Sequence, residues 1–338
     1  MNSTKFHQNL TDEYCYPDNN NSCRKEVQSS SGNIFLFFFL CCISMSTVVL
    51  NLLVIISISH FKQLHTPTNL LIMSLAVADF LVGLVVMPVN IIELKHDCWY
   101  LGRTMCALYP VINYITVSAS VGSVVFIAVD RYIAVNNPLL YSSQITIGKT
   151  SLFIVVTWSC AILYVTLFYL FSGHLLDPYM FSKCVGECVL VQYQAASIAD
   201  LCITFIGPCC TILFLYVRIF KIVRYQIKSI RAMECDNAHG RGVKSVQKYK
   251  AVKTLGIVIG VYLVCWIPFY LSYMFSESVT SISLVWIVFN WLIYINSSLN
   301  PLIYAIFYPW FRTSVKYIVT CRVFQSSSST FNLFLECS

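Results

Sequence analysis

The chain has 338 residues, of which 57% are apolar and only 11% are charged, and its mean hydropathy is +0.70. Soluble domains carry about 25% charged residues, so this composition excludes an ordinary soluble protein and indicates one embedded in a membrane. The net charge of +7 gives no evidence of nucleic-acid binding, because the basic residues gather on one face of the membrane, where contact with anionic lipid is expected.

Seven apolar stretches are each long enough to cross a bilayer as a helix. We therefore predict an all-α membrane protein, a seven-transmembrane-helix bundle. The predicted spans cover residues 34–59, 68–93, 104–136, 149–171, 193–222, 251–275 and 283–308. No cleavable signal with a basic start precedes the first span, so this span is expected to be retained.

Basic residues set the orientation of these spans. Of the 22 Lys and Arg residues, 16 fall on one side of the seven-span arrangement, with a dense run from Lys221 to Lys253. The positive-inside rule places that side in the cytoplasm and the N-terminus outside the cell. The polar segment 1–33 agrees, because it holds three N-glycosylation sequons, at Asn2, Asn9 and Asn20.

Two connections and the C-terminal part carry further signals. The extracellular connection 172–192 contains two cysteines, and the cytoplasmic connection 226–247 is predicted to be a polar loop. After the 34–308 bundle, residues 309–322 alternate apolar and basic side chains at helical spacing. We predict a short amphipathic eighth helix there, with Trp310 and Phe311 inserted in the lipid interface, followed by the cytoplasmic tail 323–338.

One acidic residue of the fifth span stands out. Asp200 lies in the apolar run Ala-Ser-Ile-Ala-Asp-Leu-Cys-Ile-Thr-Phe. A carboxylate at membrane depth costs about 2.5–3.5 kcal/mol on insertion scales, so such residues usually face the bundle interior and have a function there. Asp200 is therefore a candidate binding residue.

Short motifs mark most of the spans. They are Asn51, Leu75-Ala-Val-Ala-Asp79, Asp130-Arg131-Tyr132, Trp158, Pro208, Cys265-Trp-Ile-Pro268 and Asn300-Pro301-Leu-Ile-Tyr304. In this order and at these depths they resemble rhodopsin-like G-protein-coupled receptors over roughly residues 34–322. The run from Asn296 to Phe311 and the loop Cys184-Val-Gly-Glu-Cys188 are similar to those of trace amine-associated receptors.

That resemblance implies a G-protein switch and two disulfides. Arg131 is expected to pair with Asp130 in the silent state and to face the G protein in the active state, beside Tyr132. The partners expected in the active state are Tyr216 and Tyr304. The resemblance also implies a disulfide from Cys106 to Cys188 and a second one from Cys184 to the N-terminal segment, where Cys23 fits better than Cys15. Lys248 stands where some relatives carry an acidic residue that tethers the arginine.

A sodium site is also expected from the resemblance. The oxygen-bearing side chains at the matching positions are those of Asp79, Ser120, Asn296 and Asn300, and a hard cation prefers such ligands. The alternative is a cluster held only by hydrogen bonds. No other cofactor is expected.

The usual ligand anchor of the family is missing. In aminergic receptors an aspartate of the third span, 18 residues before the switch arginine, binds the ammonium group, and the count leads here to Asn113. Asparagine supplies no counter-charge. Asp200 lies where a subset of fish trace amine-associated receptors has an aspartate, so we expect a reversed pose with the cation at Asp200. By resemblance, the walls of the site are Asn113, Tyr114, Val117, Thr204, Trp266, Phe269, Tyr270 and Tyr294.

The predicted function follows as a hypothesis. We expect an amine-sensing, olfactory receptor of the plasma membrane that activates a heterotrimeric G protein, of the stimulatory type. A single evident acid favours a monoamine, although Glu93, Glu187 or Glu277 near the mouth leaves a diamine open. The alternatives are a receptor for a neutral ligand and, more distantly, an ion channel or transporter, against which the lack of internal repeats argues. No catalytic constellation is evident, so an enzyme is not expected.

Overall fold

Backbone groups in a bilayer must be hydrogen-bonded within their own segment, which makes helices the expected form of the apolar spans. The structure, a computed structural model, describes residues 14–16, 18–19, 21–24, 33–95, 98–171, 186, 188, 198–233, 242–275, 284–325, 328–331 and 333. The sequons Asn2, Asn9 and Asn20 lie outside these residues.

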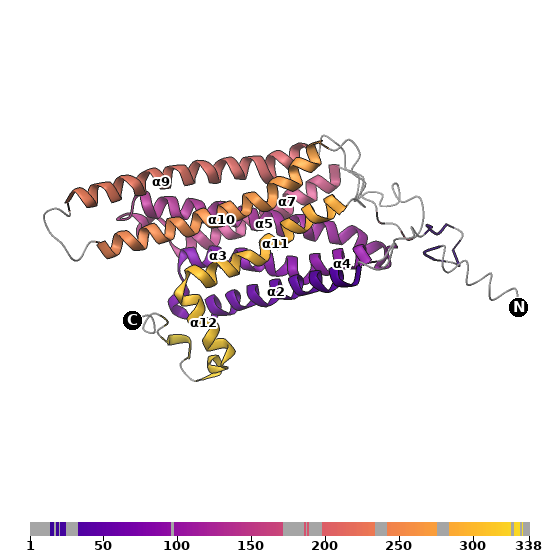
Figure 1. Ribbon diagram of the computed structural model, residues 1–338, viewed down its shortest axis with the longest axis horizontal. Helices are drawn as coiled ribbons and strands as arrows, with labels where there is room; N and C mark the ends of the chain where they lie inside the picture. The colour runs from indigo at the N-terminus through magenta and orange to yellow at the C-terminus, as the bar shows by residue number, and fades with distance from the viewer. Residues whose placement is uncertain are drawn as a thin grey trace, which may run out of the picture.

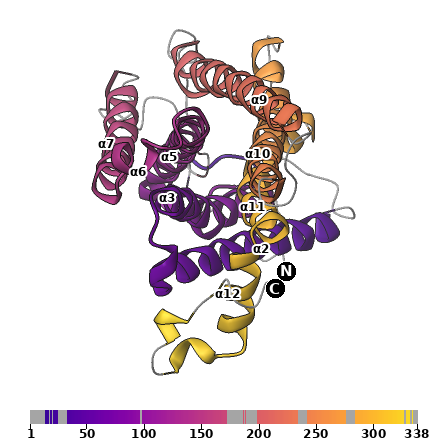
Figure 2. The ribbon, with the colours of Figure 1, turned by 90° about the vertical axis from the view of Figure 1, so that its left-hand side faces the viewer.

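The described chain is a bundle of helices; most of them lie side by side in Figure 1, and the last one lies apart, near the C-terminus. They are α2 (Asn33–His60), α3 (Pro67–Leu81), α4 (Met87–Lys95), α5 (Gly102–Asn136), α7 (Ile147–Phe171), α9 (Gly207–Met233), α10 (Gly242–Phe275), α11 (Leu284–Phe307) and α12 (Pro309–Val319). Viewed along the bundle in Figure 2, α7 lies on the outer side of α3 and α5, whereas α10 and α11 pack side by side.

The expected spans are confirmed as helices. In the described part of the chain, five helical segments are long and apolar enough to cross a membrane: Ile34–His60, Pro67–Lys95, Gly102–Asn136, Ile147–Leu170 and Ile198–Gln226. Helix α10 adds a shorter apolar stretch, Gly256–Ser272. Together with α11, which fills the place of the seventh span, they form an all-α membrane protein with its N-terminus outside the cell.

Two spans contain a turn of π-helix just before a proline. Turn η2 (Val82–Val86) precedes Pro88, and turn η3 (Leu201–Ile206) precedes Pro208. Proline has no N–H to donate, and its ring collides with the carbonyl four residues earlier, so a wider turn is one way for the helix to continue. The second π turn begins directly after Asp200. The wider turn that accompanies Pro208 therefore helps to set the direction in which the Asp200 side chain points.

The cytoplasmic connection between the fifth and sixth spans is shorter than predicted. We expected a polar loop over residues 226–247, but α9 continues to Met233 and α10 already begins at Gly242. The basic residues in this region are good helix formers, so the two helices extend beyond their apolar spans.

The short helix after the seventh span is present, but its aromatic residues are not where we predicted. Trp310 and Phe311 are 6% and 2% exposed and share a buried cluster with Val54 and Ile58 of α2 and with Phe61, which follows α2. They are protein core, so the prediction that they insert in the lipid interface was wrong. Arg312 donates to the carbonyl oxygens of Ala305 and Ile306, the orphan acceptors at the end of α11.

The tail after α12 returns to the same core and forms a C-terminal clasp, which we define as residues 328–331 and 333. Leu333 is fully buried in the cluster, and its N–H donates to Gln63 Oε1 over 3.3 Å. Phe331 stacks on Tyr317 with ring centroids 4.8 Å apart. Ser328 Oγ lies 2.9 Å from His60 Nε2 and donates to the Val323 carbonyl.

The clasp gives a testable expectation of local stability. Replacing Leu333 with alanine should lower the free energy of undocking the tail by about 2–5 kcal/mol, because removing the buried leucine side chain leaves a cavity. Limited proteolysis and amide hydrogen exchange of the purified protein should both become faster in the tail only. Phe324→Ala is the matched control, because Phe324 is 87% exposed, and an equal acceleration in it would contradict the clasp.

Candidate functional site

Asp200 is hydrogen-bonded by one residue of α7 and linked to α10 through a threonine of its own span. The Tyr164 hydroxyl of α7 donates to Asp200 Oδ1 over 2.8 Å. One helical turn later, Thr204 Oγ1 donates to the Asp200 carbonyl over 2.7 Å and lies 2.8 Å from the Tyr270 hydroxyl of α10. The side chain of Asp200 is half-buried, and no described cation pairs with it. A phenol neutralises no charge, so the carboxylate remains available to a cationic ligand.

Aromatic rings line the α10 side of this carboxylate. Phe205 stacks on Tyr270 with centroids 4.5 Å apart, and the ring of Trp266 is nearly parallel to that of Tyr270 with centroids 6.0 Å apart. Phe269 contacts Tyr270 edge to face, and Val117 of α5 packs on the same cluster. Ring faces near an acid favour a cation, through their quadrupoles.

The predicted wall residues therefore fall into two groups. Tyr114 faces α7, where it contacts the rings of Phe168 and Tyr169, and it belongs with Asp200. Asn113 and Tyr294 belong to a second group between α5 and α11. Sequence reasoning missed Tyr164, because a lone tyrosine in an apolar span gives no signal of the residue it meets.

The amide oxygen of Asn113 is buried without a hydrogen-bond partner among the described residues. Such an orphan acceptor costs about 1–3 kcal/mol, so it is uncommon unless something else supplies a donor. Asn113 thus offers a free acceptor at the position where the sequence resemblance predicts the ligand anchor.

The extracellular end carries a cross-linked cap, which we define as the described residues of 14–24 together with Cys98–Tyr100 and Gly186. A disulfide joins Cys15 to Cys98, and another joins Cys106 at the start of α5 to Cys188. Cys23 is also disulfide-bonded, and its expected partner Cys184 lies outside the described residues. The bridge from Cys15 to Cys98 was not predicted.

Gly186 is needed where the cap meets the second extracellular loop. Its φ is +105°, and a Cβ atom there would lie 2.7 Å from the Cβ atom of Cys15. Its carbonyl accepts the Trp99 N–H over 2.8 Å, while the Tyr16 hydroxyl donates to the Trp99 carbonyl. Only glycine adopts this conformation without strain, which allows the N-terminal segment to lie against the loop.

Asp79 lies at the centre of a buried polar cluster in the bundle. Its carboxylate is fully buried and accepts from Ser120 Oγ (3.2 Å), Ser297 Oγ (2.9 Å) and Asn300 Nδ2 (2.8 Å). In the described contacts Ser297, not the expected Asn296, is the third donor. Serine hydroxyls can turn to present lone pairs to a cation, so the set fits a sodium ion as well as a hydrogen-bonded cluster.

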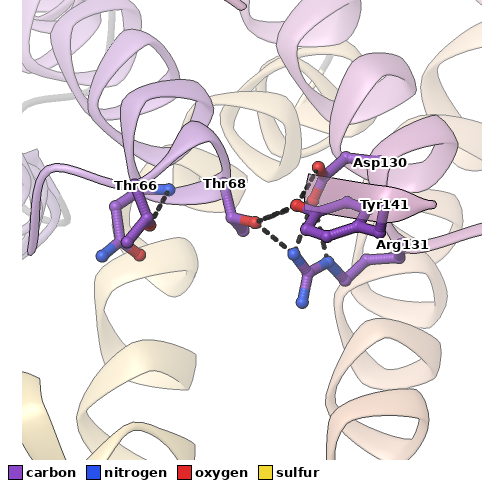
Figure 3. Close-up of polar contacts among 6 residues, drawn as sticks. Thr66, Thr68, Asp130, Arg131 and Tyr141 are labelled. Carbon is purple, nitrogen blue, oxygen red and sulfur yellow. Dashed lines mark hydrogen bonds and ion pairs between the residues drawn. The ribbon is translucent and has the colours of Figure 1, made fainter. Parts of the chain in front are cut away.

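The switch residues form a network at the cytoplasmic end of α5, drawn in Figure 3. Arg131 Nη2 and Nε contact Asp130 Oδ2 at 2.6 and 3.0 Å, and Asp130 is only 3% exposed. Thr68 of α3 donates to the same oxygen and accepts from Arg131, while the Tyr141 hydroxyl donates to Asp130 Oδ1 over 2.7 Å. The arginine is paired with its neighbour, as expected for the silent state.

Local sequence explains how the two added partners reach the switch. Thr66 caps α3 by accepting the Asn69 N–H, and Pro67 fills the first helical position, which fixes where Thr68 points (Figure 3). Tyr141 begins the short helix α6 (Tyr141–Gln144) outside the membrane spans. Burial raises the pKa of its hydroxyl, and the bond to Asp130 raises it further, so it stays a donor at neutral pH.

The two tyrosines expected as partners of Arg131 in the active state, Tyr216 and Tyr304, lie apart from it in separate clusters. Tyr216 of α9 presses its hydroxyl against Gly256 of α10, where a Cβ atom would collide with it. Tyr304 is buried in the cluster shared with α2 and α12. The side chain of Lys248 lies outside the described residues. Tyr132 packs on the core between α5 and α9.

Comparison with known proteins agrees with these motifs. Residues 50–304 match the family described as "7 transmembrane receptor (rhodopsin family)". The chain is similar to trace amine-associated receptor 13c of Danio rerio, with 40% identity over 95% of this chain and 96% of that protein. It is also similar to trace amine-associated receptor 1 of Macaca mulatta (37%, over 96% and 99%) and receptor 6 of Pan troglodytes (36%, over 96% and 96%).

Proposed function

The chain belongs to the trace amine-associated receptors of the rhodopsin family, and from this membership we propose that it senses a small amine and activates a heterotrimeric G protein. Members of this family are receptors and not enzymes, and they span the plasma membrane several times. An olfactory role and coupling to a stimulatory G protein that raises cyclic AMP are parts of the proposal.

The single observation that carries the amine proposal is the environment of Asp200. A carboxylate that accepts from one phenol, pairs with no described cation and lies one threonine away from the stacked rings of Phe205 and Tyr270 is suited to an ammonium group. Asn113, beside Tyr294 of α11, offers an acceptor but no charge. The ligand therefore binds reversed, with its cation at Asp200 between α7 and α9 and its body toward α5 and α11.

Activation follows as a shift between two states. The amine binds the state with an open cytoplasmic face better than the closed one, and the equilibrium moves by that difference in affinity. Movement of α10 about Pro268 would separate Gly256 from Tyr216 and allow Arg131 to leave Asp130 for the G protein. The closed arrangement of Figure 3 is the starting point of this change.

A panel of alkyl and aryl amines, each paired with its neutral alcohol analogue, tests the proposal in cells with a cyclic-AMP reporter. We expect responses to amines and none to the alcohols at equal concentration. Responses to the alcohols alone would instead support a receptor for a neutral ligand, the second candidate, which the uncharged Asn113 favours. Untransfected cells and a matched inactive receptor serve as controls.

Changing Asn113 to aspartate should restore the conventional pose. The new carboxylate would stand where relatives bind ammonium groups, and a charge-assisted hydrogen bond contributes about 1.5–3 kcal/mol, so amine potency should rise about tenfold or more. Dose–response curves at matched surface expression measure this. Asn113→Ala is the control, and equal potencies of the two variants would contradict the expected gain of an anchor.

We also propose that sodium binds at Asp79 in the silent state, with Ser120, Ser297 and Asn300 as its neighbours. Sodium would then lower agonist affinity by favouring that state. Asp79→Asn should remove the difference between agonist binding in sodium and in N-methylglucamine buffers. A difference that persists in this variant would argue for a cluster held by hydrogen bonds alone.

A further inference from the structure

The cytoplasmic part of α9 carries a row of basic side chains on its outer face. The helix packs against α5 and α10 through one buried stripe, made of Ile212, Leu215, Ile219 and Val223. The α9 basic row consists of Arg218, Lys221, Arg224 and Lys228, all of which are exposed. At about 3.6 residues per turn, the row lies roughly half a turn around the helix from the buried stripe. It therefore points away from the bundle.

The outer face of α9 is apolar above the row. Phe214 and Val217 are 62% and 49% exposed, and they lie roughly on the line that the row continues toward the cytoplasm. Exposed apolar side chains on a spanning helix are a surface for lipid chains. The α9 basic row therefore extends a lipid-facing surface down to the headgroups of the cytoplasmic leaflet.

Aromatic rings hold two of the guanidinium groups. Arg218 lies over the Phe214 ring at 5.7 Å, and Arg224 lies over the Phe220 ring at 4.5 Å. Helix α9 contains no Asp or Glu, and no residue of the row forms an ion pair within the described part of the chain. A ring orients an arginine without cancelling its charge, so the row is prepared for an anion.

The length of the row decides which headgroup fits it. Arg218 and Lys228 are ten residues apart, which corresponds to about 15 Å along a helix. The headgroup layer on each side of a bilayer is only about 5–8 Å thick. A headgroup with a single phosphate therefore reaches only part of the row, whereas further phosphates on a larger headgroup reach the rest. Tyr225, which is 76% exposed, adds a hydroxyl donor at the lower level.

We propose that the α9 basic row binds a lipid whose headgroup carries several phosphates, namely a phosphorylated inositol lipid. The phosphodiester next to the glycerol lies at Arg218 and Lys221, and the phosphates of the ring lie at Arg224 and Lys228. General contact with anionic lipid was expected from the net charge alone, and the geometry of α9 adds one site and one class of lipid. This proposal does not depend on the amine ligand.

Lipid binding by the purified full-length receptor tests the site. The probes are phosphatidylinositol bisphosphate, phosphatidylserine and soluble inositol trisphosphate, titrated in detergent micelles and counted by native mass spectrometry. We expect the bisphosphate lipid to bind most tightly. The triple variant Arg218→Gln, Lys221→Gln, Arg224→Gln should bind it about 100-fold more weakly, since each basic residue near a lipid surface contributes a factor of about five.

A matched control removes three exposed basic residues elsewhere on the cytoplasmic side. It carries Lys62→Gln, Lys316→Gln and Arg322→Gln, near α12, which lies on the opposite side of the bundle from α9 in Figures 1 and 2. This control should bind the bisphosphate lipid as tightly as the native receptor. Phe220→Leu keeps every charge and removes one ring, so it should weaken binding about twofold to fivefold.

Each contrary result has a definite meaning. Equal affinities for phosphatidylserine and the bisphosphate lipid, or equal losses in the two triple variants, overturn the site. Inositol trisphosphate that binds as tightly as the lipid would assign the row to a soluble anion. If the α9 variant keeps its lipid but loses coupling to a purified G protein, the row contacts a protein and the proposal is wrong.

Single substitutions keep the test decisive if the triple α9 variant is poorly expressed. Arg218→Gln and Arg224→Gln should each weaken binding of the bisphosphate lipid about fivefold in the same titration. Native affinity in both single variants overturns the proposal.

Discussion

Replacing Asp200 with alanine is expected to abolish the amine response of the receptor while leaving it at the cell surface. The ligand's ammonium group would be left desolvated without its counter-ion, and removing one partner of a buried ion pair costs about 3–5 kcal/mol. This corresponds to a loss of potency of about 100-fold or more. Surface labelling and dose–response curves of the native and variant receptors measure both parts.

Two further variants separate the charge of Asp200 from its hydrogen bond. Asp200→Asn keeps an oxygen that can accept from Tyr164 but loses the charge, so it should be nearly as inactive as the alanine variant. Tyr164→Phe keeps the charge and loses the 2.8 Å hydrogen bond, and should shift potency only about tenfold. An asparagine variant with the native dose–response curve would refute the reversed pose.

Asp130→Asn is expected to make the receptor signal without ligand. Asp130 is 3% exposed and holds Arg131 through two contacts to one carboxylate oxygen. Losing its charge removes the ion pair only from the silent state, and breaking a buried pair costs about 3–5 kcal/mol, enough to shift the equilibrium between states by about 100-fold. Basal nucleotide exchange on a purified G protein, at matched receptor amounts, measures the shift.

Tyr141→Phe is the matched comparison for the switch. It removes one neutral donor from Asp130 and leaves the pair with Arg131 in place, so basal exchange should rise by a smaller factor. If Asp130→Asn has the same basal exchange rate as the native receptor, or a lower rate than Tyr141→Phe, then the ion pair of Asp130 and Arg131 in Figure 3 does not hold the silent state.

The fold could be predicted from sequence because its main signals are local. Twenty or so apolar residues specify a spanning helix whatever surrounds them, and basic residues specify its direction. The depth of Asp79, Asp130 and Asp200 could be predicted from the same signals. These features depend on composition along one segment and on no contact between segments.

Apart from the extended ends of α9 and α10, the missed features depend on contacts between segments distant in sequence. Tyr164 meets Asp200 only because α7 comes close to the residues just before η3, and Ser297 replaces Asn296 because the rotation of α11 decides which neighbour faces Asp79. Trp310 was predicted to be a lipid anchor because the α2 residues that bury it are distant in sequence and give no signal in its own helix. Several cysteines allow many pairings, and the bridge from Cys15 to Cys98 is decided by the cap.

The two disulfides with known partners turn the chain into two covalent rings. One runs from Cys15 to Cys98 and contains α2, α3 and α4; the other runs from Cys106 to Cys188 and contains most of α5 and all of α7. A single backbone cut inside either ring therefore leaves the polypeptide in one piece. Receptors nicked in the first or second intracellular loop would migrate as intact molecules until reductant separates the fragments.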